Sequence, residues 1–238
     1  MMPQLYEYFQ GWADKGSIYV YGDPHFGDED IKAAYEEWPA AAEQVKIINS
    51  IVTKNDTLII LGDVGDYEYI KDLRAGRKIL IAGNHDTGLS YYKRKVETLY
   101  FNVNFWEGKK DSLSNLLSKL YPKDKIEIVE SYTMDNSDAE YRVELDNKLF
   151  DEVYSGPLFI GEKILLSHEP IFLPFAYNIH GHVHGGLGKN YYQTNYNACS
   201  NCVDFMPQHL GKILKEACLS RINSIHRDAI ESRKKVKQ

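Results

Sequence analysis

The N-terminal third of the chain alternates short apolar runs with segments of helical periodicity, and this alternation limits the fold more than any other feature. Apolar runs at 18–21, 58–61 and 78–82 predict buried strands, because each is bounded by polar or turn-forming residues. Between them, Val and Ile recur at helical spacing over 40–54, and 67–75 is a shorter helical segment. Strands that alternate with helices in this way build a largely parallel sheet with right-handed crossovers.

The C-terminal half has a different pattern, in which strand candidates follow one another closely. We expect a second, partly antiparallel sheet built from strands at 150–154, 158–160, 164–166, 177–182 and 191–199. From residue 208 onward, apolar residues mark one face of a long amphipathic helix. The sequence therefore predicts an α/β protein of two mixed sheets packed face to face with helices outside.

The region between these halves is less regular. We expect a helix over 89–99 and another over 112–120, ended near Pro122, whereas 135–147 is polar and typical of turns. The length of 238 residues suits one large domain or two small ones. We expect a single domain over 1–238, with an amphipathic helix and a basic tail at 206–238.

The charge balance and the apolar runs exclude several classes of partner. A formal net charge of −6 argues against a stable, sequence-independent grip on DNA or RNA. The basic stretch 221–238 is typical of a solvated helix face and a frayed tail, with a nucleic-acid or partner contact as the alternative. No apolar run is long enough to span a bilayer, and the N-terminus does not resemble a signal peptide. We expect a cytoplasmic protein that does not bind membranes.

The chain has three cysteines, of which Cys199 and Cys202 form a C-x-x-C pair. Without a second pair, one chain cannot build a four-thiolate zinc site. A thioredoxin-like pair should open a helix, but this one follows a strand-like segment, so a redox or metal role is the minor alternative. The odd number of cysteines and the lack of a secretion signal fit a reducing compartment.

Polar side chains with oxygen or nitrogen donors follow the predicted strands where each strand ends, which is where open α/β sheets place their sites. They are Asp23, His25, Asp63, Asn84, His168, His182 and His184. These residues come from the short segments 23–25, 62–63, 83–86, 167–168 and 179–185. Each segment alone is typical of a turn or loop, but together they contain six of the eight histidines. A tetrahedral zinc ion needs only four ligands, whereas seven with a shared carboxylate fit two metals about 3.5–4 Å apart. The N/O donor set favours Mn²⁺, Fe or Zn²⁺, and imidazoles disfavour Ca²⁺.

This ordered set resembles the calcineurin-like metallophosphoesterase superfamily, whose pattern is D-x-H, G-D-x-x-D, G-N-H-D/E, H and G-H-x-H. Here the pattern consists of Asp23-Pro24-His25, Gly62-Asp63-Val64-Gly65-Asp66, Gly83-Asn84-His85-Asp86, His168, and Gly181-His182-Val183-His184. The resemblance covers about residues 17–205. Ser167-His168-Glu169-Pro170 is similar to the small bacterial and phage-type phosphoesterases. The resemblance implies a four-layer αββα sandwich of two mixed sheets.

The resemblance also implies a role for each matching position. One metal would take Asp23, His25 and His184, the other would take Asn84, His168 and His182, and Asp63 would bridge them. His85 would act as general acid, and Asp66 would orient its imidazole. Asp86 has a weaker claim and is equally typical of a loop or supporting residue, and we expect a supporting or structural role for His180. The two divalent ions implied are Mn²⁺ in the first instance, with Fe or Zn²⁺ as alternatives.

The activity implied is hydrolysis of a phosphomonoester or phosphodiester by direct attack of a metal-bridging hydroxide. The substrate would be a small phosphorylated compound, including nucleotides. Asp66 is followed by Tyr67 and Glu68 rather than by arginine, which counts against the protein-phosphatase branch. The alternative is a non-catalytic scaffold of the same fold that binds a partner protein. Because all seven ligand positions and His85 are present, the enzyme is favoured.

Overall fold

The computed structural model describes residues 16–88, 96–102, 110–121, 125–132, 139–146, 149–185, 194–217, 219 and 222. These residues belong to two compact units. Unit 1 comprises Met1–Leu89 and Phe150–Gln238, and unit 2 comprises Ser90–Leu149. Unit 2 is therefore an insertion in the sequence of unit 1.

Unit 1 contains a five-stranded sheet with the strand order β12-β1-β2-β3-β7. Strands β1 (Ile18–Tyr21), β2 (Thr57–Ile60) and β3 (Arg77–Ile81) are parallel neighbours, as the alternation of strands and helices predicted. Strand β7 (Glu152–Tyr154) is parallel to β3, and β12 (Gln208–His209) is antiparallel to β1. The predicted strand over 150–154 thus belongs to this sheet and not to the second one.

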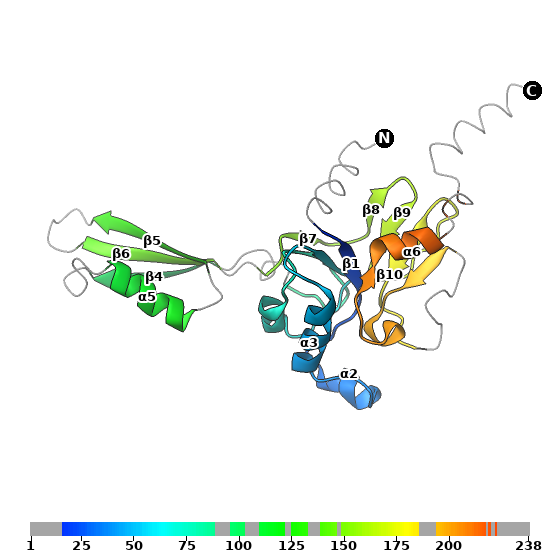
Figure 1. Ribbon diagram of the computed structural model, residues 1–238, viewed down its shortest axis with the longest axis horizontal. Helices are drawn as coiled ribbons and strands as arrows, with labels where there is room; N and C mark the ends of the chain where they lie inside the picture. The colour runs from blue at the N-terminus through cyan, green and yellow to red at the C-terminus, as the bar shows by residue number, and fades with distance from the viewer. Residues whose placement is uncertain are drawn as a thin grey trace, which may run out of the picture. The chain divides into compact units, whose positions relative to one another are not determined.

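The second sheet of unit 1 has the order β11-β10-β9-β8. It consists of β8 (Leu158–Gly161), β9 (Ile164–Leu166), β10 (Tyr177–His180) and β11 (Asn195–Asn197). The β8–β9 pair is antiparallel and the other two pairs are parallel, so the predicted mixed second sheet is confirmed. Figure 1 shows this sheet in yellow and green beside the first. The α/β class with two mixed sheets is confirmed.

In the described part of unit 1, five short helices accompany these sheets: α2 (Glu29–Ala34), α3 (Ala41–Ile51), η2 (Tyr67–Asp72), η4 (Ser200–Val203) and α6 (Leu210–Glu216). The predicted helix over 40–54 is confirmed as α3, and the predicted helical segment over 67–75 is the 3-10 helix η2. Of the predicted long C-terminal helix, α6 is described, and most of its continuation lies outside the described residues. None of the helices in the described part is both long and apolar enough to cross a membrane.

The ends of β1 and β11 meet and bring the two sheets together at the site. The amide of Gly22 donates to the carbonyl of Ala198 at 2.8 Å, and the amide of Ser200 donates to the carbonyl of Gly22 at 2.8 Å. The loop that follows β1 is therefore tied to the loop that follows β11. This contact places polar residues from both sheets within reach of one another.

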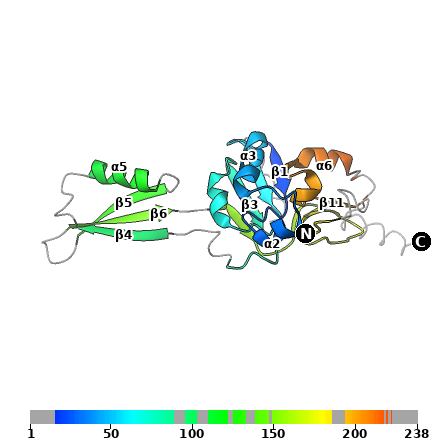
Figure 2. The ribbon, with the colours of Figure 1, turned by 90° about the horizontal axis from the view of Figure 1, so that it is seen from below.

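Unit 2 is a three-stranded antiparallel sheet of order β4-β6-β5 with one helix on a face, as Figure 2 shows. The strands are β4 (Val96–Asn102), β5 (Lys125–Tyr132) and β6 (Ala139–Asp146), and the helix is α5 (Lys110–Leu120). Its core consists of the buried side chains of Leu113, Leu117, Tyr141 and Val143. The predicted helix over 112–120 is confirmed as α5.

Two sequence predictions fail in unit 2. The helix expected over 89–99 is wrong for its described end, since Val96 begins β4. The turn-rich region expected at 135–147 contains β6, in which polar residues alternate with Tyr141 and Val143. In a strand with one buried face, every second residue is polar. The polar residues of β6 made the segment resemble a turn, and the alternation of apolar and polar residues was missed.

Candidate metal centre

The predicted ligands lie on loops at the carboxyl ends of five strands. Asp23 and His25 follow β1, Asp63 follows β2, and Asn84 follows β3. His168 follows β9, and His182 and His184 follow β10. Because β1, β2 and β3 are parallel and in the same sheet, their carboxyl ends meet at one edge. All seven residues belong to unit 1.

The backbone at several of these positions is strained. Non-glycine residues with positive φ include Asp23 at 52°, His25 at 41°, Asp63 at 50° and His182 at 67°. Such conformations cost about 1–3 kcal/mol each and persist where the surrounding contacts determine them, as at functional sites. The strain at four of the predicted ligands therefore supports a functional site here.

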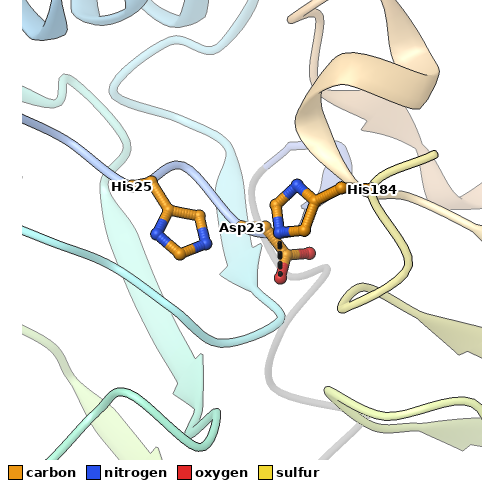
Figure 3. Close-up of side chains that lie close together, drawn as sticks. All are labelled: Asp23, His25 and His184. Atoms are coloured by element: carbon orange, nitrogen blue, oxygen red, sulfur yellow. Dashed lines mark ion pairs between the residues drawn. The ribbon is translucent and has the colours of Figure 1, made fainter. Parts of the chain in front are cut away.

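The first group of donors comprises Asp23, His25 and His184, which Figure 3 draws. One ligand atom from each lies within 4.8 Å of the others, and the Nε2 atom of His184 is 3.8 Å from Oδ1 of Asp23. Oδ1 of Asp23 and Nε2 of His25 are buried without a hydrogen-bond partner. Buried polar atoms normally have partners. A cation between these atoms would supply one, so the group fits a metal ion.

The protonation states at this group also suit a cation. Burial raises the pKa of the Asp23 carboxyl well above its usual range, and the nearby carboxylate of Asp63 adds to this effect. A bound cation would offset the cost of burying this carboxylate. Burial, followed by the neighbouring His25, lowers the pKa of His184 to about 4. His184 is therefore neutral near pH 7, which is the form that binds metals.

The second group comprises Asp63, His168 and His182, whose ligand atoms also lie within 4.8 Å of one another. The Nε2 atom of His168 is 3.4 Å from Oδ2 of Asp63 and 3.0 Å from Nδ1 of His182. The amide oxygen of Asn84 lies 2.8 Å from the same His168 nitrogen. Oδ2 of Asp63 is also 3.8 Å from Nε2 of His25, so this carboxylate lies between the two groups.

The buried carboxylate of Asp86 organises the loops that carry Asp63 and Asn84. It accepts hydrogen bonds from the amides of Asp63 at 2.9 Å, Val64 at 3.0 Å and Gly83 at 2.7 Å. Asp86 therefore joins the loop after β2 to the loop after β3. The supporting role that we left open for this residue is consistent with these contacts.

Close packing at Gly62 depends on the lack of a side chain. Gly62 has φ of +81°, and a Cβ atom there would lie 2.7 Å from the Cα atom of Gly83 and against the ring of His168. Glycine adopts positive φ without steric cost, and it lets the backbone approach closely. Gly62 therefore lets the loop after β2 pack against Gly83 and His168.

The two residues predicted for catalysis, His85 and Asp66, are both exposed. The His85 side chain is exposed, its amide donates to Oδ1 of Asp63 at 3.0 Å, and its ring centroid is 5.9 Å from that of His25. Asp66 is the N-cap of η2 and accepts a hydrogen bond from the amide of Glu68 at 3.0 Å. The orienting role of Asp66 stays a prediction. His180 is buried and lies outside both groups of donors.

Three supporting residues were not found by sequence reasoning. The Asp28 carboxylate is 2.9 Å from Nδ1 of His25, Gln44 donates to the carbonyl of Pro24 at 3.0 Å, and Ser200 donates to the carbonyl of Asp23 at 2.7 Å. Gln44 could have been found from the sequence, because it is a polar residue on the apolar face of the predicted helix 40–54. Asp28 directly precedes a helix and lies three residues after His25, which is a helix-capping signal.

The C-x-x-C pair lies beside the first group. Cys199 is the N-cap of η4, so the pair does open a helix, contrary to our expectation from the strand-like segment before it. Neither cysteine is part of a disulfide, and Sγ of Cys199 is 3.3 Å from Nδ1 of His184. Burial raises the pKa of the Cys199 thiol, so this side chain is not a reactive thiolate at neutral pH.

A family model described as calcineurin-like phosphoesterase matches residues 16–198, which is most of the chain. The chain belongs to the calcineurin-like phosphoesterase family. Among solved structures, a protein of unknown function from Aquifex aeolicus is 23% identical, with 84% of this chain and 98% of that chain covered and a TM-score of 0.48. Comparison with curated proteins gives no match. Calcineurin-like phosphoesterases typically bind two divalent metals, and the two groups of donors here fit that requirement.

Proposed function

We propose that the chain is a two-metal phosphoesterase that hydrolyses a small phosphorylated substrate. The observation that supports this most strongly is the pair of adjacent donor groups, with Asp63 between them. Asp23 and His25 each contribute a buried atom that has no hydrogen-bond partner. In a purely structural core, such buried polar atoms normally have hydrogen-bond partners.

The proposed ligands are those inferred from the motifs. Asp23, His25 and His184 would hold one ion, and Asn84, His168 and His182 the other, with Asp63 shared. Nitrogen and oxygen donors with no thiolate suit Mn²⁺ first, and Fe or Zn²⁺ as alternatives. Two bound ions would lower the pKa of a water molecule towards neutrality and polarise the phosphate oxygens.

The chain's own side chains would supply proton transfer and orientation. His85 is exposed beside the donor groups, and its backbone is anchored to Asp63. We propose that its imidazole donates a proton to the leaving oxygen or stabilises the charge that develops there. Asp66 would orient this ring if the two side chains approach each other when substrate binds.

The substrate would be a phosphomonoester or a phosphodiester, including nucleotides. The cytoplasm is the proposed location. The second candidate function is a scaffold that binds a partner protein without catalysis. The presence of every proposed ligand favours the enzyme.

The test is hydrolysis of p-nitrophenyl phosphate and bis-(p-nitrophenyl) phosphate with and without added Mn²⁺. We expect Mn²⁺-dependent release of nitrophenol from at least one of them, and its loss in excess chelator. His85→Ala should retain its Mn²⁺ but lose about 10²–10⁴-fold in turnover, the usual size of a general acid contribution. Full turnover in this variant would remove His85 from the mechanism. Bound metal without activity on either compound, or on a panel of nucleotides, would favour the scaffold.

A further inference from the structure

We infer that Asp28 is a positioning residue for the proposed metal centre, whose carboxylate fixes both the orientation and the tautomer of His25. The inference rests on the proposed two-metal function. It concerns a residue outside the D-x-H motif, since Asp28 lies three positions after His25.

A tight turn brings the two side chains together. The amide of Asp28 donates to the carbonyl of His25 at 3.2 Å. Gly27, between them, has φ of +69°, a left-handed conformation that favours glycine. The turn returns the Asp28 carboxylate to the imidazole, and Oδ2 lies 2.9 Å from Nδ1 of the ring.

The other oxygen of the same carboxylate caps helix α2. Oδ1 of Asp28 accepts hydrogen bonds from the amides of Asp30 at 3.0 Å and Ile31 at 3.2 Å. The helix thus holds the carboxylate in place, with one oxygen for each task. The first turn of α2 thereby becomes part of the support of the metal centre.

The identity of the acceptor determines where the imidazole proton lies. An ionised carboxylate only accepts hydrogen bonds, so in the neutral imidazole of His25 the proton lies on Nδ1 and Nε2 is bare. Nε2 is buried, has no hydrogen-bond partner, and lies 3.8 Å from Oδ2 of Asp63. A bare nitrogen directed between the two donor groups is the form that a metal requires.

The other imidazoles at the centre have different outer partners. Nδ1 of His168 lies 3.0 Å from the carbonyl of Leu61, and Nδ1 of His184 lies 3.3 Å from Sγ of Cys199. Among the described imidazoles of the two groups, His25 is the one with a hydrogen-bonded carboxylate. A carboxylate partner raises the basicity of the opposite nitrogen. His25 should therefore be the strongest imidazole donor of the first group.

The near-isosteric variant Asp28→Asn separates capping from positioning. Asparagine caps helices as well as aspartate does. However, it has only one oxygen, and if this oxygen caps α2, its NH₂ group faces Nδ1 of His25. An NH₂ donor there favours the tautomer with the proton on Nε2, which blocks the metal-binding atom. If Asp28 only capped α2, Asp28→Asn would bind Mn²⁺ with the same affinity as the parent.

The measurement is calorimetric titration of Mn²⁺ into the metal-free full-length protein, with the fold followed by circular dichroism. We expect one of two Mn²⁺ ions to bind about 10–100-fold more weakly in Asp28→Asn, the usual effect of removing such a partner. Asp28→Ser, which also caps α2 but is too short to reach the ring, should show a similar loss. The matched control is Asp56→Ser, because the Asp56 carboxylate accepts from the amides of Ser17 and Thr53, both at 2.8 Å. This control should bind Mn²⁺ like the parent.

Long-range ¹H–¹⁵N spectra of the imidazoles give a second readout that does not depend on activity. In the metal-free parent, the proton of His25 should lie on Nδ1, and in Asp28→Asn it should move to Nε2. Finding it on Nε2 in the parent would overturn the inference, as would parent affinity for both ions in Asp28→Asn and Asp28→Ser. If the parent itself fails to bind two ions, the proposed function is what fails, whatever the tautomer.

Discussion

Single carboxylates hold the ligand loops of this protein in conformations that the chain would otherwise avoid. Positive φ at Asp63 is accompanied by three amide hydrogen bonds to Asp86, two of them from Asp63 and the next residue, Val64. Charge-assisted bonds of this kind contribute about 1.5–3 kcal/mol. At the scale of the residue, much of the site's order therefore depends on side chains that are not themselves proposed ligands.

The variant Asp86→Asn tests this dependence. The asparagine side chain keeps one acceptor oxygen, but its NH₂ group replaces the other. This NH₂ group would face backbone amides that are themselves hydrogen-bond donors. We expect the free energy of unfolding to fall by about 3 kcal/mol, measured by urea denaturation of the metal-free protein. The control is Asp151→Asn, where an exposed carboxylate accepts from the amide of Lys78 at 2.8 Å. Equal losses in the two variants would contradict a special role for Asp86.

Sequence reasoning found the proposed ligands because their types and order are visible without coordinates. Asp23, His25 and Asp63 each follow an apolar run, and the run predicts a strand whose end faces the site. The contacts of Asp28 were not visible, because they depend on where α2 begins and on how the Gly27 turn is folded. The C-x-x-C helix was missed for the same reason, since a four-residue 3-10 helix leaves no periodic signal.

At the scale of the element, α3 does more than cover a sheet. Gln44 of this helix is fully buried, accepts from the hydroxyl of Tyr21 at 3.0 Å and donates to the carbonyl of Pro24 at 3.0 Å. Pro24 lies between the strained residues Asp23 and His25. The helix thus holds the β1 loop through one polar side chain on its buried face.

Replacement of Gln44 by leucine keeps the volume and the helix but removes the acceptor of the Tyr21 hydroxyl and the donor to the Pro24 carbonyl, both of which are buried contacts. We expect Gln44→Leu to lower the free energy of unfolding by about 2–4 kcal/mol, and to weaken Mn²⁺ binding by distorting the β1 loop. Urea denaturation and Mn²⁺ titration measure these effects. The exposed Lys46 on the same helix gives the control Lys46→Leu, which should change stability by under about 0.5 kcal/mol. A Gln44→Leu protein as stable as this control would contradict the account.

The elements of unit 1 were more predictable than those of unit 2. Strand β2 is buried at all four positions and consists of apolar residues after Thr57, so its sequence alone indicates a core strand. Strand β6 pairs with both β4 and β5, and its polar face conceals its period of two. Its identity depends on partners that are distant in sequence, which local propensity cannot supply.

At the scale of the whole molecule, the proposed centre belongs to unit 1 alone, although unit 2 interrupts its sequence between β3 and β7. Every proposed ligand, together with His85 and Asp28, lies in Met1–Leu89 or Phe150–Gln238. Unit 2 has its own core around Leu113 and Val143. Unit 2 therefore does not depend on the proposed ligands for its core. The single domain expected over 1–238 stays a prediction that can be tested.

Replacement of residues 90–149 by a flexible linker makes that test. Because β3 and β7 are parallel, the linker must return along the sheet and needs about a dozen Gly and Ser residues. We expect the shortened protein to keep a cooperative unfolding transition and to bind as many Mn²⁺ ions as the parent. A shortened protein that does not fold would show that the chain is one indivisible domain.

The central claim is that two metal ions share one carboxylate at the edge where the strands end. The most direct test is an anomalous difference map from crystals of the Mn²⁺-loaded protein. We expect two peaks about 3.5–4 Å apart, one beside Asp23, His25 and His184 and the other beside His168 and His182, with Asp63 beside both. A single peak, or two peaks too far apart for one carboxylate to bridge, would contradict it.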